Sequence, residues 1–162
     1  MRRTPRLATP ARASVLSRAG KTLTALLAAV LLSGCSGFGR EWRAAAKQPT
    51  PTNDITGRWE GRWVSESNGH HGKLRCVMTR ATGDLCFAHF HATYAGVFSF
   101  GYTATLNVTN DVAGFRLSGE TDLGKFAGGV YRYDGLANPT NFLCRYQAAD
   151  DHGRFEMTRP TQ

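Results

Sequence analysis

The chain has 162 residues and a formal net charge of +8, from 20 Lys and Arg residues against 12 Asp and Glu residues. Six of the basic residues and none of the acidic ones lie in residues 1–34, so 14 basic residues face 12 acidic ones in the remaining 128, a net charge of +2. No run of Lys or Arg is left there that would bind nucleic acid, and the length suffices for one domain.

The first 34 residues have the pattern of an export signal. An apolar run of about ten residues, 23–32, follows the basic residues, and it is half as long as the roughly twenty residues that a transmembrane helix needs. Basic residues before such a run and small residues after it are typical of a targeting segment. Arg2-Arg3 is also a feature of twin-arginine signals, but it lies far from the apolar run.

The end of this run, Leu32-Ser33-Gly34-Cys35, resembles the lipobox of bacterial lipoproteins. The resemblance implies that residues 1–34 are a signal peptide cleaved just before Cys35, and that Cys35 carries diacylglyceryl and palmitate groups. Two or more acyl chains give stable membrane anchoring, so the expected location is the cell envelope. Ser36 resembles the residue that sorts lipoproteins to the outer membrane, on its periplasmic or surface face.

Residues 35–54 are expected to form a flexible, lipidated tether. Within it, residues 41–47 are predicted to form about two helical turns, and the Pro-Thr repeat at 49–52 favours an extended linker.

From residue 55 onward the sequence alternates with a period of two. The clearest case is residues 98–109, where six apolar residues from Phe98 to Val108 are separated by polar residues or glycine. A strand places all six on one face, whereas a helix would scatter them. The same test predicts seven more strands, at 57–66, 72–80, 84–94, 112–121, 125–134, 140–148 and 153–159.

Turn residues separate these strands, and the hairpin connections indicate an all-β domain over residues 55–160. Closing eight antiparallel strands into an up-and-down barrel removes both sheet edges. A β-sandwich is the alternative.

Two hairpin registers follow from the turns. A turn at Asn110-Asp111 places Leu106 opposite Phe115. A turn about Ala81 places Cys76 opposite Cys86, which predicts a disulfide if their Cα atoms are about 4.4–6.8 Å apart. The third cysteine of the domain, Cys144, is interpreted as a buried apolar side chain, with a cross-barrel bridge as the alternative.

The two ends of this domain resemble the calycin group, which contains the lipocalins. Gly57-Arg58-Trp59 matches the Gly-x-Trp of the first calycin strand, and Arg159 matches the basic residue of the last strand that lies over this tryptophan. The resemblance implies closure by a Trp59–Arg159 contact and a cavity for a small molecule. Because a barrel of this size can also be filled by its own side chains, the many inward aromatic residues argue against a large cavity.

Catalytic motifs are weak in this sequence. His89 and His91 share a strand face at a spacing that metal sites use, but parity points them outward, so they are weak metal candidates and no metal or other cofactor is expected. No Ser-His-Asp order, inward carboxylate pair or phosphate loop is present, so the chain is not expected to be an enzyme.

The sequence therefore predicts a lipid-anchored envelope protein whose barrel binds or carries a small apolar ligand. The alternative is a structural or interaction protein with a solid barrel, for example an inhibitor of an envelope enzyme that uses the loop at 67–72.

Overall fold

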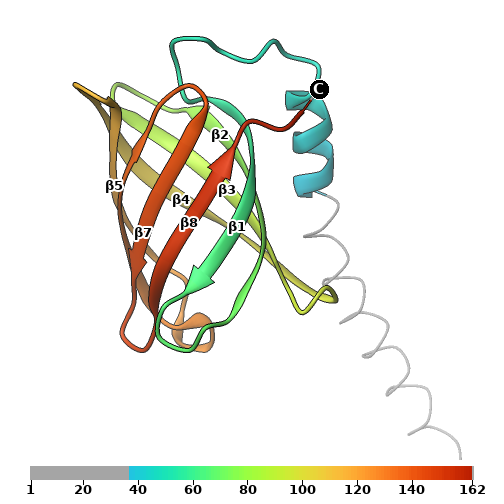
Figure 1. Cartoon of the computed structure of the whole chain (residues 1–162), viewed down its shortest axis with the longest axis vertical. Coiled ribbons are helices and arrows are strands. Elements are labelled where there is room, and N and C mark those ends of the chain that lie inside the picture. The colour runs from blue at the N-terminus through green and yellow to red at the C-terminus, as the bar shows by residue number, and fades with distance from the viewer. Residues whose placement is uncertain (1–36, 162) are drawn as a thin grey trace, which may run out of the picture. The chain divides into compact units, whose positions relative to one another are not determined.

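Eight antiparallel strands close into a barrel in the computed structural model, which describes residues 37–161, the side chain of Phe126 excepted (Figure 1). Each strand pairs with the next in sequence, and β8 pairs with β1. The predicted barrel is confirmed. The strands are β1 Gly57–Ser65, β2 His71–Arg80, β3 Leu85–Tyr94, β4 Phe98–Asp111, β5 Gly114–Asp122, β6 Val130–Ala137, β7 Asn141–Gln147 and β8 His152–Thr158.

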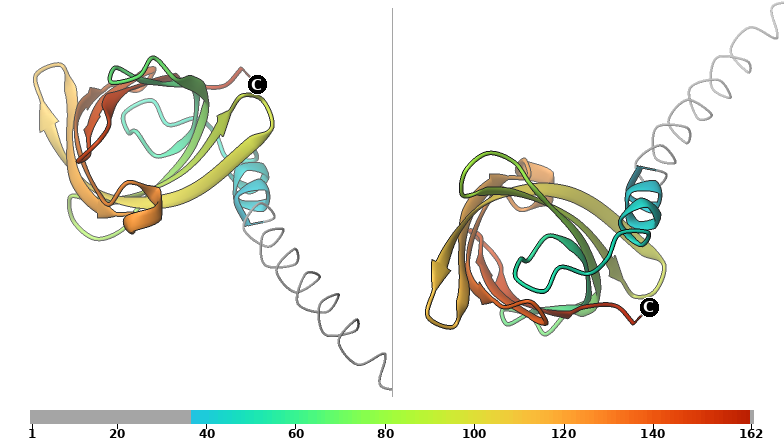
Figure 2. Two further views of the ribbon diagram at one scale, coloured as in Figure 1. Left: turned by 90° about the horizontal axis from the view of Figure 1, so that it is seen from below. Right: turned by 90° about the horizontal axis from the view of Figure 1, so that it is seen from above.

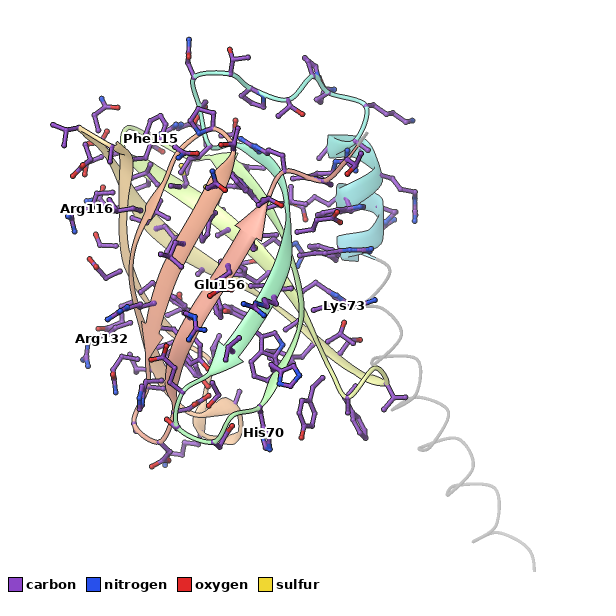
Figure 3. All side chains as sticks on the ribbon, viewed as in Figure 1. His70, Lys73, Phe115, Arg116, Arg132 and Glu156 are labelled. Atoms are coloured by element: carbon purple, nitrogen blue, oxygen red, sulfur yellow. The ribbon has the colours of Figure 1, made fainter. Side chains whose placement is uncertain are left out.

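The alternation of the sequence decides which side chains fill the barrel. In β2 the inward residues Leu74, Cys76 and Met78 are buried, while their neighbours Lys73 and Arg75 are exposed. The same alternation holds in β3, β7 and β8. Outward charged residues such as Lys73, Arg116 and Arg132 project away from the wall (Figure 3). The core is thus a single apolar column enclosed by the strands.

The predicted strand at 125–134 is wrong in its first half. Residues Lys125–Ala127 form a short 3-10 helix, η1, and β6 begins at Val130. Gly128 and Gly129 have φ angles of 93° and 76°, a left-handed conformation that glycine adopts readily. These two residues turn the chain after η1, so β6 begins only at Val130.

The predicted register between β4 and β5 is also wrong. Residues 112–113 form the turn, so Phe115 pairs with Asn110 rather than with Leu106. The Ala113 amide donates a hydrogen bond of 3.1 Å to the Asp111 side chain, and Gly114 has a φ of 132°. The β4–β5 turn is therefore centred two residues further along the chain than expected.

The predicted disulfide is not formed. Cys76 pairs with Phe90, and Cys86 pairs with Arg80, because the β2–β3 turn is centred on Gly83. The two cysteines are four residues out of register, about 13 Å along a strand, and a disulfide needs Cα atoms within about 7 Å. Both are buried free thiols, as is Cys144.

The β3–β4 hairpin departs from the barrel wall at its tip. Phe98 and Phe100 were expected to be inward, but they are 68% and 52% exposed, because the hairpin extends beyond the neighbouring strands (Figure 2). At the tip, Ala95 takes a φ of 50° and Gly96 a φ of 75°.

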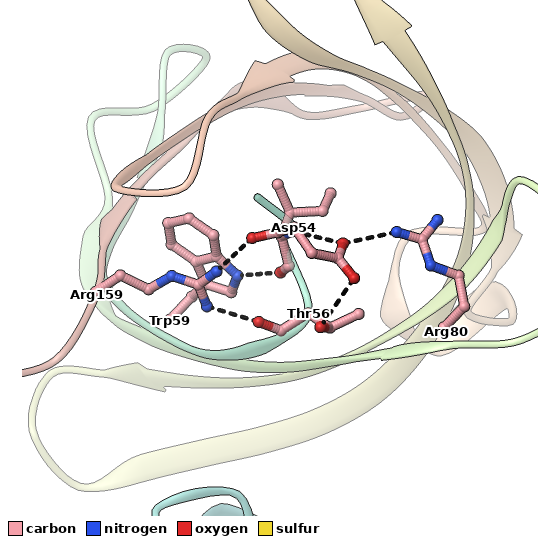
Figure 4. Close-up of polar contacts among 6 residues, drawn as sticks. Asp54, Thr56, Trp59, Arg80 and Arg159 are labelled. Carbon is pink, nitrogen blue, oxygen red and sulfur yellow. Dashed lines mark hydrogen bonds and ion pairs between the residues drawn. The ribbon is translucent and has the colours of Figure 1, made fainter. Parts of the chain in front are cut away.

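One end of the barrel is sealed by Trp59 and Arg159 (Figure 4). Trp59 is fully buried and donates a hydrogen bond of 2.8 Å to the Ile55 carbonyl. The Arg159 guanidinium carbon lies 3.8 Å from the centroid of the Trp59 ring, which is the contact that the sequence predicted. A cation in this position contributes about 0.5–2 kcal/mol.

Arg159 also satisfies the backbone at this end. It donates hydrogen bonds to the carbonyl oxygens of Asp54 and Thr56 before β1, of Arg58 at the start of β1, and of Pro139 between β6 and β7. Burial lowers the pKa of Arg159 to about 10, so the side chain stays protonated at neutral pH.

Asp54 extends this network toward β2. Its carboxylate accepts hydrogen bonds from the Ile55 amide and from Arg80, each at 2.6 Å. Burial by itself would raise the pKa of Asp54, but these two interactions outweigh it and lower the pKa.

A helix packs against the outside of the barrel at residues 37–45, within the segment expected to be a flexible tether. Phe38 is 4% exposed and lies against the imidazole rings of His89 and His91, at centroid distances of 5.1 and 4.9 Å. Glu41 pairs with His89 Nδ1 at 2.5 Å. This N-terminal helix is therefore docked, and the extended segment after it leads into β1.

Within the described residues, no helix has the length and apolar character to cross a bilayer. The predicted signal peptide, residues 1–34, and Cys35 lie outside the described part of the chain.

Arg159→Ala is expected to lower the free energy of unfolding by roughly 2–4 kcal/mol, since it removes charged hydrogen bonds and the contact with Trp59. Arg159→Lys should cause a smaller loss in the free energy of unfolding than Arg159→Ala, because one ammonium group keeps the charge but cannot reach all four carbonyls. Urea unfolding followed by tryptophan fluorescence measures both. The control, Arg116→Ala on the outer wall, should change stability by less than about 0.5 kcal/mol. Equal effects of Arg159→Ala and Arg116→Ala would contradict a sealing role.

Phe38→Ala is expected to release the N-terminal helix and leave the barrel intact. Amide hydrogen exchange over residues 42–48 should accelerate roughly a hundredfold, because the helix loses its buried anchor. The unfolding midpoint of the barrel should not change. Arg40→Ala, an exposed change on the same helix, serves as the control. Unchanged exchange in Phe38→Ala would mean that other contacts dock the helix.

Candidate ligand-binding site

A cavity of about 400 Å³ opens at the end of the barrel opposite Trp59. Loops β1–β2, β5–β6 and β7–β8 surround this end, and the short helix η1 lies beside it (Figure 1). Small-molecule sites commonly have volumes of about 300–1,000 Å³. We call this cavity the end pocket. Its aromatic lining comes from five strands and consists of Trp63, Phe100, Tyr102, Tyr131, Tyr146 and Phe155.

Aromatic rings also form a layer beneath the end pocket. The Phe90 ring lies 5.3 Å from the rings of both Tyr102 and Phe155, and the Phe155 ring lies 5.1 Å from that of Tyr146. Phe90 is fully buried. This layer separates the end pocket from the half of the core that Trp59 seals.

Glycines at inward positions give the end pocket its room. Gly72 and Gly153 have the parity of inward residues in β2 and β8, where larger side chains would otherwise fill the barrel. A Cβ atom on Gly72 would lie 2.7 Å from Trp63 Nε1, and one on Gly153 would lie 2.8 Å from Tyr146 Oη. The nearest atoms to these added Cβ atoms would be carbonyl oxygens of the neighbouring strands, that of Thr93 at 1.8 Å for Gly72 and that of Val64 at 2.0 Å for Gly153, so the glycines allow both the strands and the aromatic side chains to approach closely.

The Gly-x-Trp pattern of residues 57–59 occurs a second time in β1, at Gly61-Arg62-Trp63. Gly61 brings β1 against β8, since a Cβ atom there would lie 2.0 Å from the Glu156 carbonyl oxygen. Trp63 follows on the inner face, and its Nε1 donates a hydrogen bond of 3.2 Å to the Thr93 carbonyl. The two repeats thus supply one tryptophan to the sealed end and one to the end pocket.

One carboxylate, that of Asp151, lies among these apolar walls. Its Oδ1 accepts a hydrogen bond of 2.6 Å from the Ser65 hydroxyl, and its Oδ2 accepts one of 3.0 Å from the Tyr146 hydroxyl. Ser65 is 1% exposed, so these contacts hold the β7–β8 loop firmly at the pocket. Burial and the nearby Asp151 charge both raise the pKa of Tyr146 and of Tyr131.

The residues that the sequence singled out lie elsewhere. Trp59 and Arg159 are at the sealed end, and Cys35 is outside the described residues. His89 and His91 point outward, as parity predicted, and lie beneath Phe38. Burial is the largest cause that lowers the pKa of His91, followed by the charge of Arg75.

The structure gives these histidines a packing role. Among residues 37–161, no group of three or more His, Cys, Asp or Glu side chains is placed to hold a metal ion.

The three described thiols are also outside the end pocket. Burial raises the pKa of Cys76 and of Cys86 and raises that of Cys144 to about 12. A thiol is a poor nucleophile unless it ionises, so these cysteines serve as small apolar core residues.

Sequence reasoning missed Asp151, Tyr131 and the role of the inward glycines. Asp151 stands in a turn, where an acidic residue is ordinary, and only the fold brings it to the pocket. The glycines did carry a signal, because they occupy inward positions in strands whose other inward residues are large.

No protein-family model matches the chain, and no curated protein matches it. Among solved structures, a de novo designed fluorescence-activating β-barrel is similar at 16% identity, with a TM-score of 0.49. The match covers 70% of this chain and all of the designed one.

Proposed function

We propose that this chain is a non-enzymatic binding or carrier protein that holds a small ligand in the end pocket. The observation that carries the proposal is a cavity of about 400 Å³ with six aromatic walls and a fixed carboxylate. A solid barrel would have no such room. The pocket contains a single carboxylate among the described residues, so it lacks the paired acid and base that hydrolytic chemistry commonly uses.

The proposed location is the bacterial cell envelope. The lipobox-like Leu32-Ser33-Gly34-Cys35 supports an acylated Cys35 and a membrane-anchored protein, with the outer membrane favoured. A ligand carrier at this position would take up or release a small apolar or amphipathic molecule beside the membrane.

A second candidate function, protein interaction, is favoured by the β3–β4 hairpin tip. Val97 and Phe98 are 77% and 68% exposed there, and exposed apolar clusters often mark binding surfaces. An inhibitor or scaffold function would use this tip rather than the pocket.

Native mass spectrometry of the full chain, purified from its own envelope, distinguishes the two functions. We expect a small molecule to be released from the protein, because the pocket is large enough to retain one. Ala92→Phe places a ring in the pocket from β3 and should abolish retention. The matched control, Ala113→Phe, changes an exposed alanine in the turn at the opposite end and should retain the ligand.

A protein partner in place of a small molecule, with equal recovery in the two alanine variants, would favour the interaction function instead. Thermal unfolding of both variants checks that the barrel is intact.

Cys35→Ser is expected to abolish metabolic labelling with palmitate and to move the protein out of the membrane fraction, since the acyl chains are the anchor. Cys144→Ser, which changes a buried thiol, should leave labelling unaltered. Labelling that persists in Cys35→Ser would overturn the anchoring proposal without affecting the ligand-binding proposal.

A further inference from the structure

We propose that the end pocket selects organic cations, namely substituted ammonium groups attached to an apolar body. This inference rests on the proposed ligand-binding function and specifies the class of ligand. It follows from the combination of a carboxylate without a cationic partner and aromatic faces on several sides of one cavity.

The charge of Asp151 is not neutralised by the protein. Its two partners, the hydroxyls of Ser65 and Tyr146, are neutral donors, and no ion pair joins it to a basic side chain of residues 37–161. A carboxylate in partly buried surroundings is stabilised by an opposite charge nearby. The Asp151 carboxylate is therefore available to pair with a positively charged group of a ligand in the pocket.

None of the basic residues within 37–161 lines the end pocket. Besides Asp151 and three tyrosines, its lining is apolar. Lys125 belongs to η1 but is exposed and outside the lining, and the His70 ring contacts that of Tyr94 at a centroid distance of 5.1 Å with the planes tilted. An anionic ligand would meet only repulsion here, so charge alone favours a cation.

The aromatic walls favour a particular kind of cation. The faces of Trp, Tyr and Phe attract a cation within about 6 Å of the ring centroid, and the pocket presents Trp63, Tyr131 and Tyr146 around the Asp151 loop. A compact ammonium group loses much hydration on entering such walls. Alkyl substituents reduce this hydration and add apolar contact, so a substituted ammonium group fits best.

The end pocket has its carboxylate and its apolar lining in different places, which matches a ligand with a cationic group at one end and an apolar body at the other. Asp151 lies in the loop between β7 and β8, at the outer end, whereas Leu74 and Ala92 line the wall and Phe155 belongs to the aromatic layer beneath. The apolar body of the ligand would lie against Leu74, Ala92 and Phe155, and its cationic group would lie beside Asp151 in the β7–β8 loop.

Three benzyl compounds of similar size separate charge from shape. Benzyltrimethylammonium is the cation, 2,2-dimethylpropylbenzene is its neutral isostere, and benzylsulfonate is the anion. Equilibrium dialysis against the full chain in detergent, with detergent alone subtracted, measures the dissociation constant of each. We expect the cation to bind at least about tenfold more tightly than the neutral compound, and the anion to bind most weakly.

Asp151→Asn keeps the side-chain shape and removes the charge, so the preference for the cation over the neutral isostere should disappear. The matched control is Asp150→Asn, which removes the neighbouring, exposed charge outside the pocket and should leave the preference unchanged. If Asp151 only fixes the β7–β8 loop in place, Asp151→Asn would weaken the binding of the cation and of the neutral isostere equally. The preference for the cation would then persist, which overturns the proposal.

Tyr131→Leu provides a second test if Asp151→Asn does not fold. It keeps apolar volume and removes one aromatic ring, so the dissociation constant of the cation should rise several-fold while that of the neutral compound changes by less than about twofold. Equal binding of cation and neutral isostere by the unaltered chain would overturn cation selection and leave the carrier function standing. Failure of all three compounds to bind, together with no small molecule in the native mass spectrum, would overturn both.

Discussion

A single guanidinium group holds the sealed end of this barrel together. Arg159 donates to carbonyl oxygens in the segment entering β1 and in the β6–β7 turn while it covers Trp59. Closure of an eight-stranded barrel requires the last strand to meet the first, and this residue lies just after β8. At the opposite end the β1–β8 ladder continues to Ser65 and Gly153, so that end is open without an unpaired sheet edge.

The two ends differ because the same short pattern is used twice. Trp59 meets Arg159, whereas Trp63, four residues later, meets a backbone carbonyl and leaves its ring toward the lumen. Between the two, the aromatic layer around Phe90 divides the interior. Large side chains therefore do not exclude a cavity in this barrel; their placement in one layer, with Gly72 and Gly153 beside it, leaves the space above free.

Alternation in the sequence predicted the strand faces and the barrel, and the Gly-x-Trp resemblance predicted the Trp59–Arg159 contact, but both tested hairpin registers were wrong. In each, the true turn lies two residues further along, so the pairing shifts by four residues in total and Cys76 meets Phe90 instead of Cys86. An even shift keeps every side chain on its face, so burial patterns cannot detect it. Turn chemistry at Gly83 and Gly114 decides the register. The resemblance implied a cavity, but the carboxylate in its lining escaped prediction for a related reason, since Asp151 belongs to a loop whose position only the closed barrel defines.

The docked N-terminal helix has a consequence for how a ligand would reach the pocket. Phe38 lies over His91, nearer the pocket end of β3, while residues 45–49 lie beside Arg80 at the sealed end. Two residue steps, at most about 8 Å of chain, separate residue 37 from Cys35. If Cys35 is acylated as proposed, the docked helix holds the barrel within a few residues of its lipid anchor, so the protein stays beside the membrane instead of extending from it on a long tether. Amphipathic cations accumulate at anionic membrane surfaces. Such a ligand would then pass between bilayer and protein by a lateral route along the headgroups, with little time spent in bulk water.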